Sequence, residues 1–299
     1  MPVTAVLDTT IHHIEAGAGA PVVLLHGNPT SSHAWRNVLP HLGDGLRVLA
    51  PDLVGMGGSG KPDIPYRFVD HARYLDAWFD ALDLGEVVLV GHDWGGALAL
   101  DRAARHPDRV RGVALMETII RPLTWADFPN GARPRYEALR GPAGEQKVLE
   151  ENFFIDQALF ATVLSGLRDE DHAAYAAPYP TPASRRPLLA WPREMPIDGE
   201  PADVVARVEA YDAWLASSPE VPKLLLTFDG TEDTLMIGAR IAAWSAEHIA
   251  GLEIVGCGPA AHVVQEDQPL AIAAAVGAWL DRHALRVGAP DGAVDQLPR

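Results

Sequence analysis

The sequence predicts an α/β protein: a mostly parallel central sheet, flanked by helices, with a helical cap inserted after the strand that ends at Glu117. Short apolar runs of strand length alternate with helical segments and glycine-rich loops, which is typical of parallel sheets covered by helices on both faces. Between Glu117 and about Pro222 this alternation stops, and amphipathic helical patterns replace the strands. An insertion at the carboxyl end of a strand would cover the site formed there.

Individual elements follow from the spacing of apolar residues. Buried strands are expected at residues 21–25, 46–50, 87–90, 110–116, 223–228 and 252–255. Tyr74 and Trp78 recur at helical spacing in the core, and Val204, Val208 and Tyr211 do so in the cap. The predicted organisation is a core of residues 1–119 and 216–286, a cap of residues 120–215 and a disordered tail at 287–299, which is rich in glycine and proline.

Composition excludes several classes of partner. A chain of 299 residues with 48% hydrophobic content can bury a large core, and a net charge of −16 argues against nucleic acid or an anionic membrane surface. Cys257 is the only cysteine, which excludes an intrachain disulfide and a cysteine metal cluster. No apolar stretch approaches the roughly 20 residues of a membrane span, and the first residues lack the pattern of a signal peptide. We expect a cytoplasmic monomer or weak homo-oligomer.

The most informative motif is Gly91-His92-Asp93-Trp94-Gly95-Gly96, which joins a buried strand to a helix. Glycines on both sides allow the sharp turn that exposes a nucleophile above a sheet, a position where many hydrolases carry serine. Asp93 is a carboxylate, which needs no base to become a nucleophile and can attack a saturated carbon. A strand-helix turn with a capping aspartate is the structural alternative.

An ester formed on Asp93 must be hydrolysed by an activated water. His262 is the candidate base, because it follows the last predicted strand, as in enzymes with a nucleophile on a central strand. Its partner carboxylate is either Glu117, which ends the strand after the nucleophile's strand, or Asp233, which follows the next strand. Sequence order alone leaves both open.

Two neutral donors accompany the nucleophile. Asn28 lies in the loop after the first clear buried strand, and Trp94 follows Asp93 directly. A backbone N–H of the loop at residues 26–29, paired with that of Trp94, would form an oxyanion hole, and the amide of Asn28 and the indole N–H of Trp94 could hold a leaving anion such as a halide. The alternatives are an asparagine that stabilises its loop and a tryptophan that packs in the core.

Together these motifs resemble haloalkane dehalogenases of the α/β-hydrolase superfamily, from about residue 10 to residue 285. The most specific stretches are residues 26–32 with 35–37, 52–57, 91–96, 151–154, 185–187, 191–196 and 262–267. The loop at 230–235 departs from the closest subfamily and resembles the acid-bearing loop of a sister subfamily, so Asp233 stays an alternative acid.

The resemblance implies an α/β-hydrolase fold and hydrolysis of a halogenated alkane by water, with release of a halide ion and without metal or organic cofactor. It also implies the roles of the site residues: Asp93 is the nucleophile, His262 the base and Glu117 the acid. Asn28 and Trp94 are the halide ligands, and Phe154 and Val263 line the pocket.

Three other functions share parts of this pattern. Epoxide hydrolases have the same elbow but use cap tyrosines, for which the candidates are Tyr136, Tyr175, Tyr179 and Tyr211. Asn28 favours a halide site, because an epoxide has no evident use for an amide donor there. A coelenterazine luciferase-like monooxygenase resembles the same motifs, including residues 152–154. A non-catalytic receptor on the same fold would be expected to lose catalytic positions, all of which are occupied here.

Overall fold

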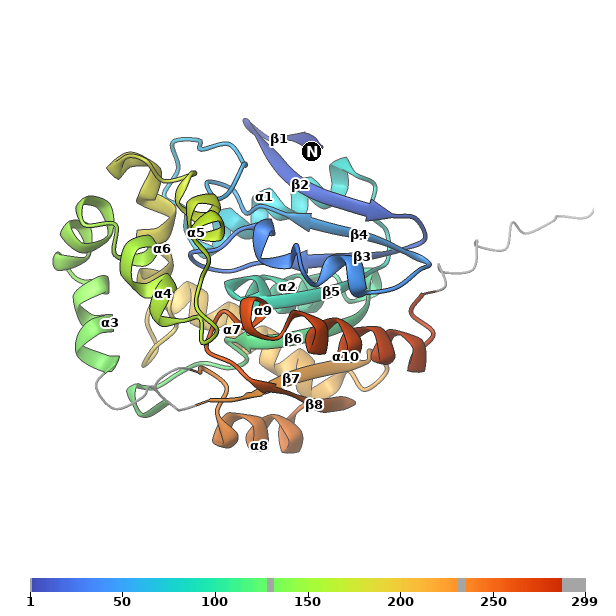
Figure 1. The fold of residues 1–299 in the computed structure, drawn as a ribbon. Coiled ribbons are helices and arrows are strands. Elements are labelled where there is room, and N and C mark those ends of the chain that lie inside the picture. Colours follow the sequence, from blue (N-terminus) through green and yellow to red (C-terminus); the bar gives the residue numbers. More distant parts are fainter. Residues whose placement is uncertain (1, 128–131, 231–234, 287–299) are drawn as a thin grey trace, which may run out of the picture.

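The computed structural model describes residues 2–127, 132–230 and 235–286. Within these residues an eight-stranded sheet forms the centre, in the order β1-β2-β4-β3-β5-β6-β7-β8 (Figure 1). The strands are β1 (Val3–Val6), β2 (Thr9–Gly17), β3 (Ala20–Leu25), β4 (Leu46–Pro51), β5 (Val87–Asp93), β6 (Val110–Thr118), β7 (Lys223–Asp229) and β8 (Leu252–Pro259). The strands β3 to β8 pair in parallel, whereas β2 pairs antiparallel with β1 and β4.

The central strands are buried on both faces because helices cover both. In β3, Val23 and Leu25 join the core that contains α1 (Phe68–Ala81) and α2 (Trp94–Arg105), whereas Val22 and Leu24 join the opposite core with α10 (Pro269–Arg282). This alternation follows from the two-residue period of a strand. The remaining core helices are α8 (Ala239–His248) and α9 (Val264–Asp267), and short helical turns are η1 (Ser32–Trp35), η2 (Leu39–His41) and η3 (Pro107–Arg109).

The predicted fold class is confirmed, and every predicted strand is present. Each predicted run lies within one of the strands β3 to β8, and each of these strands extends at least one residue beyond the run. The antiparallel strands β1 and β2 had not been predicted from the sequence. In β2 the buried Ile11 and His13 alternate with less buried polar neighbours, so no continuous apolar run marks the strand.

Between β6 and β7 the described chain is helical. It forms η4 (Trp125–Asp127), α3 (Ala132–Arg140), the π-helical turns η5 (Glu145–Glu150) and η6 (Phe154–Ala158), α4 (Leu159–Ala161), α5 (Asp169–Ala176), η7 (Pro182–Arg185), α6 (Arg186–Glu194) and α7 (Ala202–Ser217). Figure 1 shows α3, α4, α5 and α6 gathered at one end of the sheet. The cap boundaries at residues 120 and 215 stay a prediction.

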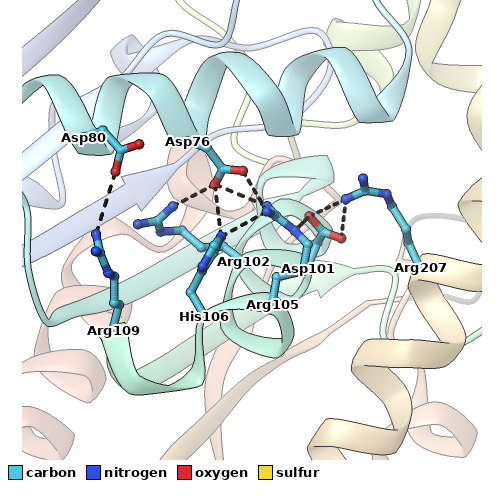
Figure 2. Close-up of polar contacts among 8 residues, drawn as sticks. All are labelled: Asp76, Asp80, Asp101, Arg102, Arg105, His106, Arg109 and Arg207. Carbon is cyan, nitrogen blue, oxygen red and sulfur yellow. Dashed lines mark hydrogen bonds and ion pairs between the residues drawn. The ribbon is translucent and has the colours of Figure 1, made fainter.

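An ion-pair network joins α7 to the core helices (Figure 2). Arg207 on α7 donates to both carboxylate oxygens of Asp101 on α2, at 2.9 and 3.0 Å. Arg105 bridges Asp101 at 2.8 Å and Asp76 on α1 at 2.7 Å, and Asp76 also accepts from Arg102 at 2.7 Å. Because Asp101 is buried, its charge-assisted hydrogen bonds hold α7 in a defined position on α2.

No helix within the described ranges is long and apolar enough to cross a bilayer. The predicted tail at 287–299 and the alternative acid Asp233 both lie outside the residues that the structure describes.

Candidate active site

The chain turns from strand β5 into helix α2 at Asp93. This residue has φ of 51° and ψ of −128°, a conformation that non-glycine residues rarely adopt. Glycines make the turn possible: a Cβ on Gly91 would lie 2.4 Å from Cα of Gly96, and a Cβ on Gly95 would lie 2.3 Å from a backbone oxygen of β3. The elbow therefore places the Asp93 side chain at the carboxyl end of a central strand.

Backbone N–H groups hold the Asp93 carboxylate. The N–H of Asn28 donates to Oδ1 at 2.7 Å, and the backbone N–H of Trp94 contributes to lowering the pKa of this carboxylate. Gly27 leaves the space in which the carboxylate lies, since a Cβ there would be 2.2 Å from Oδ1. The loop after β3 thus supplies a backbone N–H donor to the Asp93 carboxylate.

His262, in the loop after β8, lies between two carboxylates. Its Nδ1 is 3.2 Å from Oε2 of Glu117, and its Nε2 is 3.5 Å from Oδ2 of Asp93. Glu117 is buried near the end of β6, where Oε2 accepts from the N–H of Met236 at 2.6 Å and Oε1 from the N–H of Ile237 at 3.0 Å. Because the anchored carboxylate accepts from Nδ1–H, it favours the neutral tautomer that carries its proton on Nδ1 and leaves Nε2 free to take a proton.

His262 and the carboxylates beside it influence one another's pKa. Burial lowers the pKa of His262, but its hydrogen bonds with Asp93 and Glu117 outweigh burial and raise that pKa to about 10. Burial also raises the pKa of Asp93, yet the pairing with His262 outweighs it and leaves that pKa below its ordinary value. Asp93 and Glu117 therefore favour the charged form of the His262 imidazole in the resting site.

Two further residues position the His262 loop, and sequence reasoning assigned neither of them a role. Nε2 of His92 donates to the backbone oxygen of His262 at 2.7 Å, and burial lowers the pKa of His92 to about 3, which keeps its ring neutral. The carboxylate of Asp267 accepts from the N–H of Ala261 at 2.9 Å and from the cap N–H groups of Leu164 at 3.0 Å and Ser165 at 2.7 Å. Asp267 thereby ties the loop to the cap.

Asn28 and Trp94 both line the cavity beside Asp93. The indole of Trp94 stacks on Trp191 with 4.7 Å between ring centroids, which fixes the plane of the ring. The Oδ1 atom of Asn28 is buried and has no hydrogen-bond partner in the described part of the chain. The site thus offers an amide and an indole, both uncharged, close to the carboxylate.

The cavity lies between core and cap and has a volume of about 410 Å³. Its lining consists of Asn28, Pro29, Asp93, Trp94, Arg135, Tyr136, Leu139, Phe153, Phe154, Gln157, Ala158, Ala161, Thr162, Pro192, Met195 and His262. Phe154 is therefore at the cavity, as expected. Nothing in the sequence indicated that Arg135 and Gln157 line the cavity, because a helical pattern does not tell which face of a cap helix covers the site.

Val263 is placed elsewhere than expected. Its side chain is fully buried with Ala34, Leu159, Val163 and Tyr175 and is not part of the cavity wall. The reason is local: the N–H of Val263 donates to the backbone oxygen of Thr162 at 2.9 Å, so this residue packs into the cap.

Of the four cap tyrosines considered for epoxide activation, Tyr136 lines the cavity. The hydroxyl of Tyr175 donates to Glu266 and that of Tyr211 to the backbone oxygen of Ile119, while Tyr179 is buried away from the cavity wall. Among the described residues, no group of three or more His, Cys, Asp or Glu side chains could hold a metal ion.

Known proteins share both this sequence and this fold. Residues 20–183 match the family described as alpha/beta hydrolase fold. Haloalkane dehalogenase from Mesorhizobium japonicum is 50% identical over 280 residues, which cover 92% of this chain and 89% of that relative. The chain belongs to the haloalkane dehalogenase family. Another member, from Agrobacterium fabrum, is 46% identical over 92% of this chain and 89% of its own length.

Solved structures of the family agree with this assignment. The haloalkane dehalogenase DbeA from Bradyrhizobium elkani superposes with a TM-score of 0.90 at 42% identity, covering 95% of this chain and 98% of that one. DatA from Agrobacterium tumefaciens C58 superposes with a TM-score of 0.88 at 44% identity, covering 94% and 96% of the two chains. The resemblance seen in the sequence motifs is therefore confirmed over nearly the whole chain.

Proposed function

We propose that this protein hydrolyses the carbon–halogen bond of halogenated alkanes to give an alcohol, a halide ion and a proton. The observation that carries the proposal is the position of the Asp93 carboxylate, which faces the cavity beside Asn28 and Trp94 with His262 Nε2 3.5 Å away. Membership of the haloalkane dehalogenase family supports the same reading.

The first step is displacement at carbon. A carboxylate oxygen of Asp93 attacks the carbon that bears the halogen, and the carbon–halogen bond breaks with its electron pair on the halide. The Asn28 amide and the Trp94 indole donate to the departing anion. Neutral donors suit this task because they stabilise the halide without binding it as tightly as a buried cation would.

The second step releases the alcohol. Ester formation removes the negative charge of Asp93, which is a main cause of the raised pKa of His262, so the imidazole loses its proton more readily. Nε2 then takes a proton from water, and the hydroxide adds to Cγ of Asp93. The oxyanion accepts from the N–H groups of Asn28 and Trp94.

Collapse of this tetrahedral intermediate breaks the bond to the alkoxide, which takes the proton from His262. Asp93 is left as a carboxylic acid and loses its proton to solvent. Glu117 orients His262 and stabilises its charged form throughout.

The test is bromide release from 1-bromobutane or 1,2-dibromoethane, with Asp93→Ala as the control. Release that disappears in Asp93→Ala supports hydrolysis through Asp93. A His262→Phe variant should release about one bromide per enzyme and keep the alkyl group as added mass on the peptide that contains Asp93. Absence of release from folded wild-type protein would contradict the proposal and direct the next assays to epoxides and to coelenterazine.

A further inference from the structure

A cationic side chain lies at the cap side of the cavity. Arg135 on α3 lines the cavity and is exposed to solvent, as is Gln157 on η6. Asp93, in contrast, is buried and belongs to the core. The cavity wall therefore combines a buried carboxylate and neutral donors with an exposed guanidinium and an exposed amide.

Among residues 2–127, 132–230 and 235–286, no hydrogen bond or ion pair engages the guanidinium of Arg135. Its neighbour Arg133 donates to Glu137 at 2.8 Å, and Arg140 on the same helix donates to a backbone oxygen of Met195. Within the described ranges, no carboxylate lies at ion-pair distance from Arg135. A free guanidinium with several N–H donors in one plane is suited to bind a carboxylate through two parallel hydrogen bonds.

The charge of Arg135 affects Tyr136, which also lines the cavity. The next residue, Tyr136, is a lining residue whose pKa burial and the charge of Asp93 raise to about 12, while the charge of Arg135 acts in the opposite direction. The phenol of Tyr136 is thus within electrostatic reach of both Asp93 and Arg135. The same wall also contains the apolar side chains of Leu139, Phe153 and Phe154.

We propose that Arg135 is a specificity-determining residue that selects substrates with a carboxylate at the end remote from the halogen, that is, ω-halogenated alkanoates. The halogen would lie beside Asn28 and Trp94, the methylene chain against the apolar wall, and the carboxylate at Arg135 with Gln157 as a second donor. The inference rests on the proposed function. A local cation matters here because the net charge of −16 otherwise repels anionic substrates.

The test compares kcat/KM for 6-bromohexanoate and 1-bromohexane in three proteins: wild type, Arg135→Gln and the matched control Arg133→Gln. The two arginines are two residues apart on α3, but the cavity lining includes Arg135 and not Arg133. We expect the ratio of the two kcat/KM values to fall on the order of tenfold in Arg135→Gln, mainly through KM for the acid. Arg133→Gln should leave the ratio unchanged, and Arg135→Lys should restore part of it.

Salt supplies a second readout, because screening weakens an exposed ion pair. In wild type the ratio should fall as sodium chloride rises, and in Arg135→Gln it should respond less. A ratio that is the same in wild type and Arg135→Gln, or that falls equally in Arg133→Gln, would overturn the role of Arg135 while the dehalogenase function stands. Absence of bromide release from either substrate in wild type would instead overturn the proposed function, and this inference with it.

Discussion

Glu117 and His262 are joined by a contact of 3.2 Å between Oε2 and Nδ1. They come from the end of β6 and from the loop after β8, with β7 between the two strands. Two backbone N–H groups, of Met236 and Ile237, anchor the carboxylate independently of the histidine. The orientation of the imidazole is therefore set before any substrate enters.

Replacing Glu117 by Gln should lower kcat for bromide release by on the order of 10⁴, as loss of the acid does in the Ser-His-Asp triad, because the amide no longer favours the required tautomer or stabilises the imidazolium. Circular dichroism would check that the variant is folded. Asp233→Asn is the matched comparison and should change kcat little. The opposite pattern, with Asp233→Asn inactive and Glu117→Gln active, would make Asp233 the acid.

The pKa of His262 should depend on the charge of Asp93. In wild type, hydrogen bonds and charges from Asp93 and Glu117 raise it to about 10, and the Asp93→Ala variant removes one of the two anions. Removing a negative charge disfavours the imidazolium, so the pKa should fall toward the ordinary value of 6.5. NMR titration of the His262 ring in both proteins would measure this. An equal pKa in the two proteins would contradict the coupling and the proposed activation of the base.

Trp94→Phe should reduce kcat/KM for bromoalkanes by about 10- to 100-fold, because a hydrogen bond to a charged group is worth about 1.5–3 kcal/mol. The phenyl ring keeps an aromatic partner for Trp191, so the fold should be retained. Trp191→Phe is the control, because it changes the stacking partner and leaves the indole N–H of Trp94 in place. Loss of similar size in both variants would assign the effect to packing and not to halide binding.

Asp101→Asn should lower the free energy of unfolding by about 1–3 kcal/mol, because the buried carboxylate accepts hydrogen bonds from both Arg105 and Arg207. Asp80 offers a control in the same region (Figure 2): its contact with Arg109 is 3.7 Å long and exposed. Asp80→Asn should therefore have no measurable effect. Urea unfolding of the two variants would compare them, and equal stability would show that α7 is held by its apolar contacts alone.

Local sequence patterns were enough to predict most of the strands. The strands β3 to β7 were readable because most of their side chains are buried on both faces of the sheet, whereas the edge strand β8 is only partly buried. The strand β2 was not readable, since His13 and its polar neighbours interrupt any continuous apolar run. Likewise, Phe154 was expected at the cavity and lies there, whereas Val263, adjacent to His262 in the chain, turns into the cap core. Neighbours in sequence share a loop but not the direction of their side chains.

The strand-helix elbow at Asp93 could be predicted from the sequence alone, because glycines at 91, 95 and 96 permit the close local packing that the turn requires. The contact between Glu117 and His262 could not be predicted from local sequence. It depends on the order of the strands in the sheet and on the loop from β7 to α8, whose backbone N–H groups bind Glu117. The position of Arg135 at the cavity likewise depends on tertiary packing. The helical period can be recognised in the sequence, but which face of the helix covers the site depends on packing against residues far away in the chain.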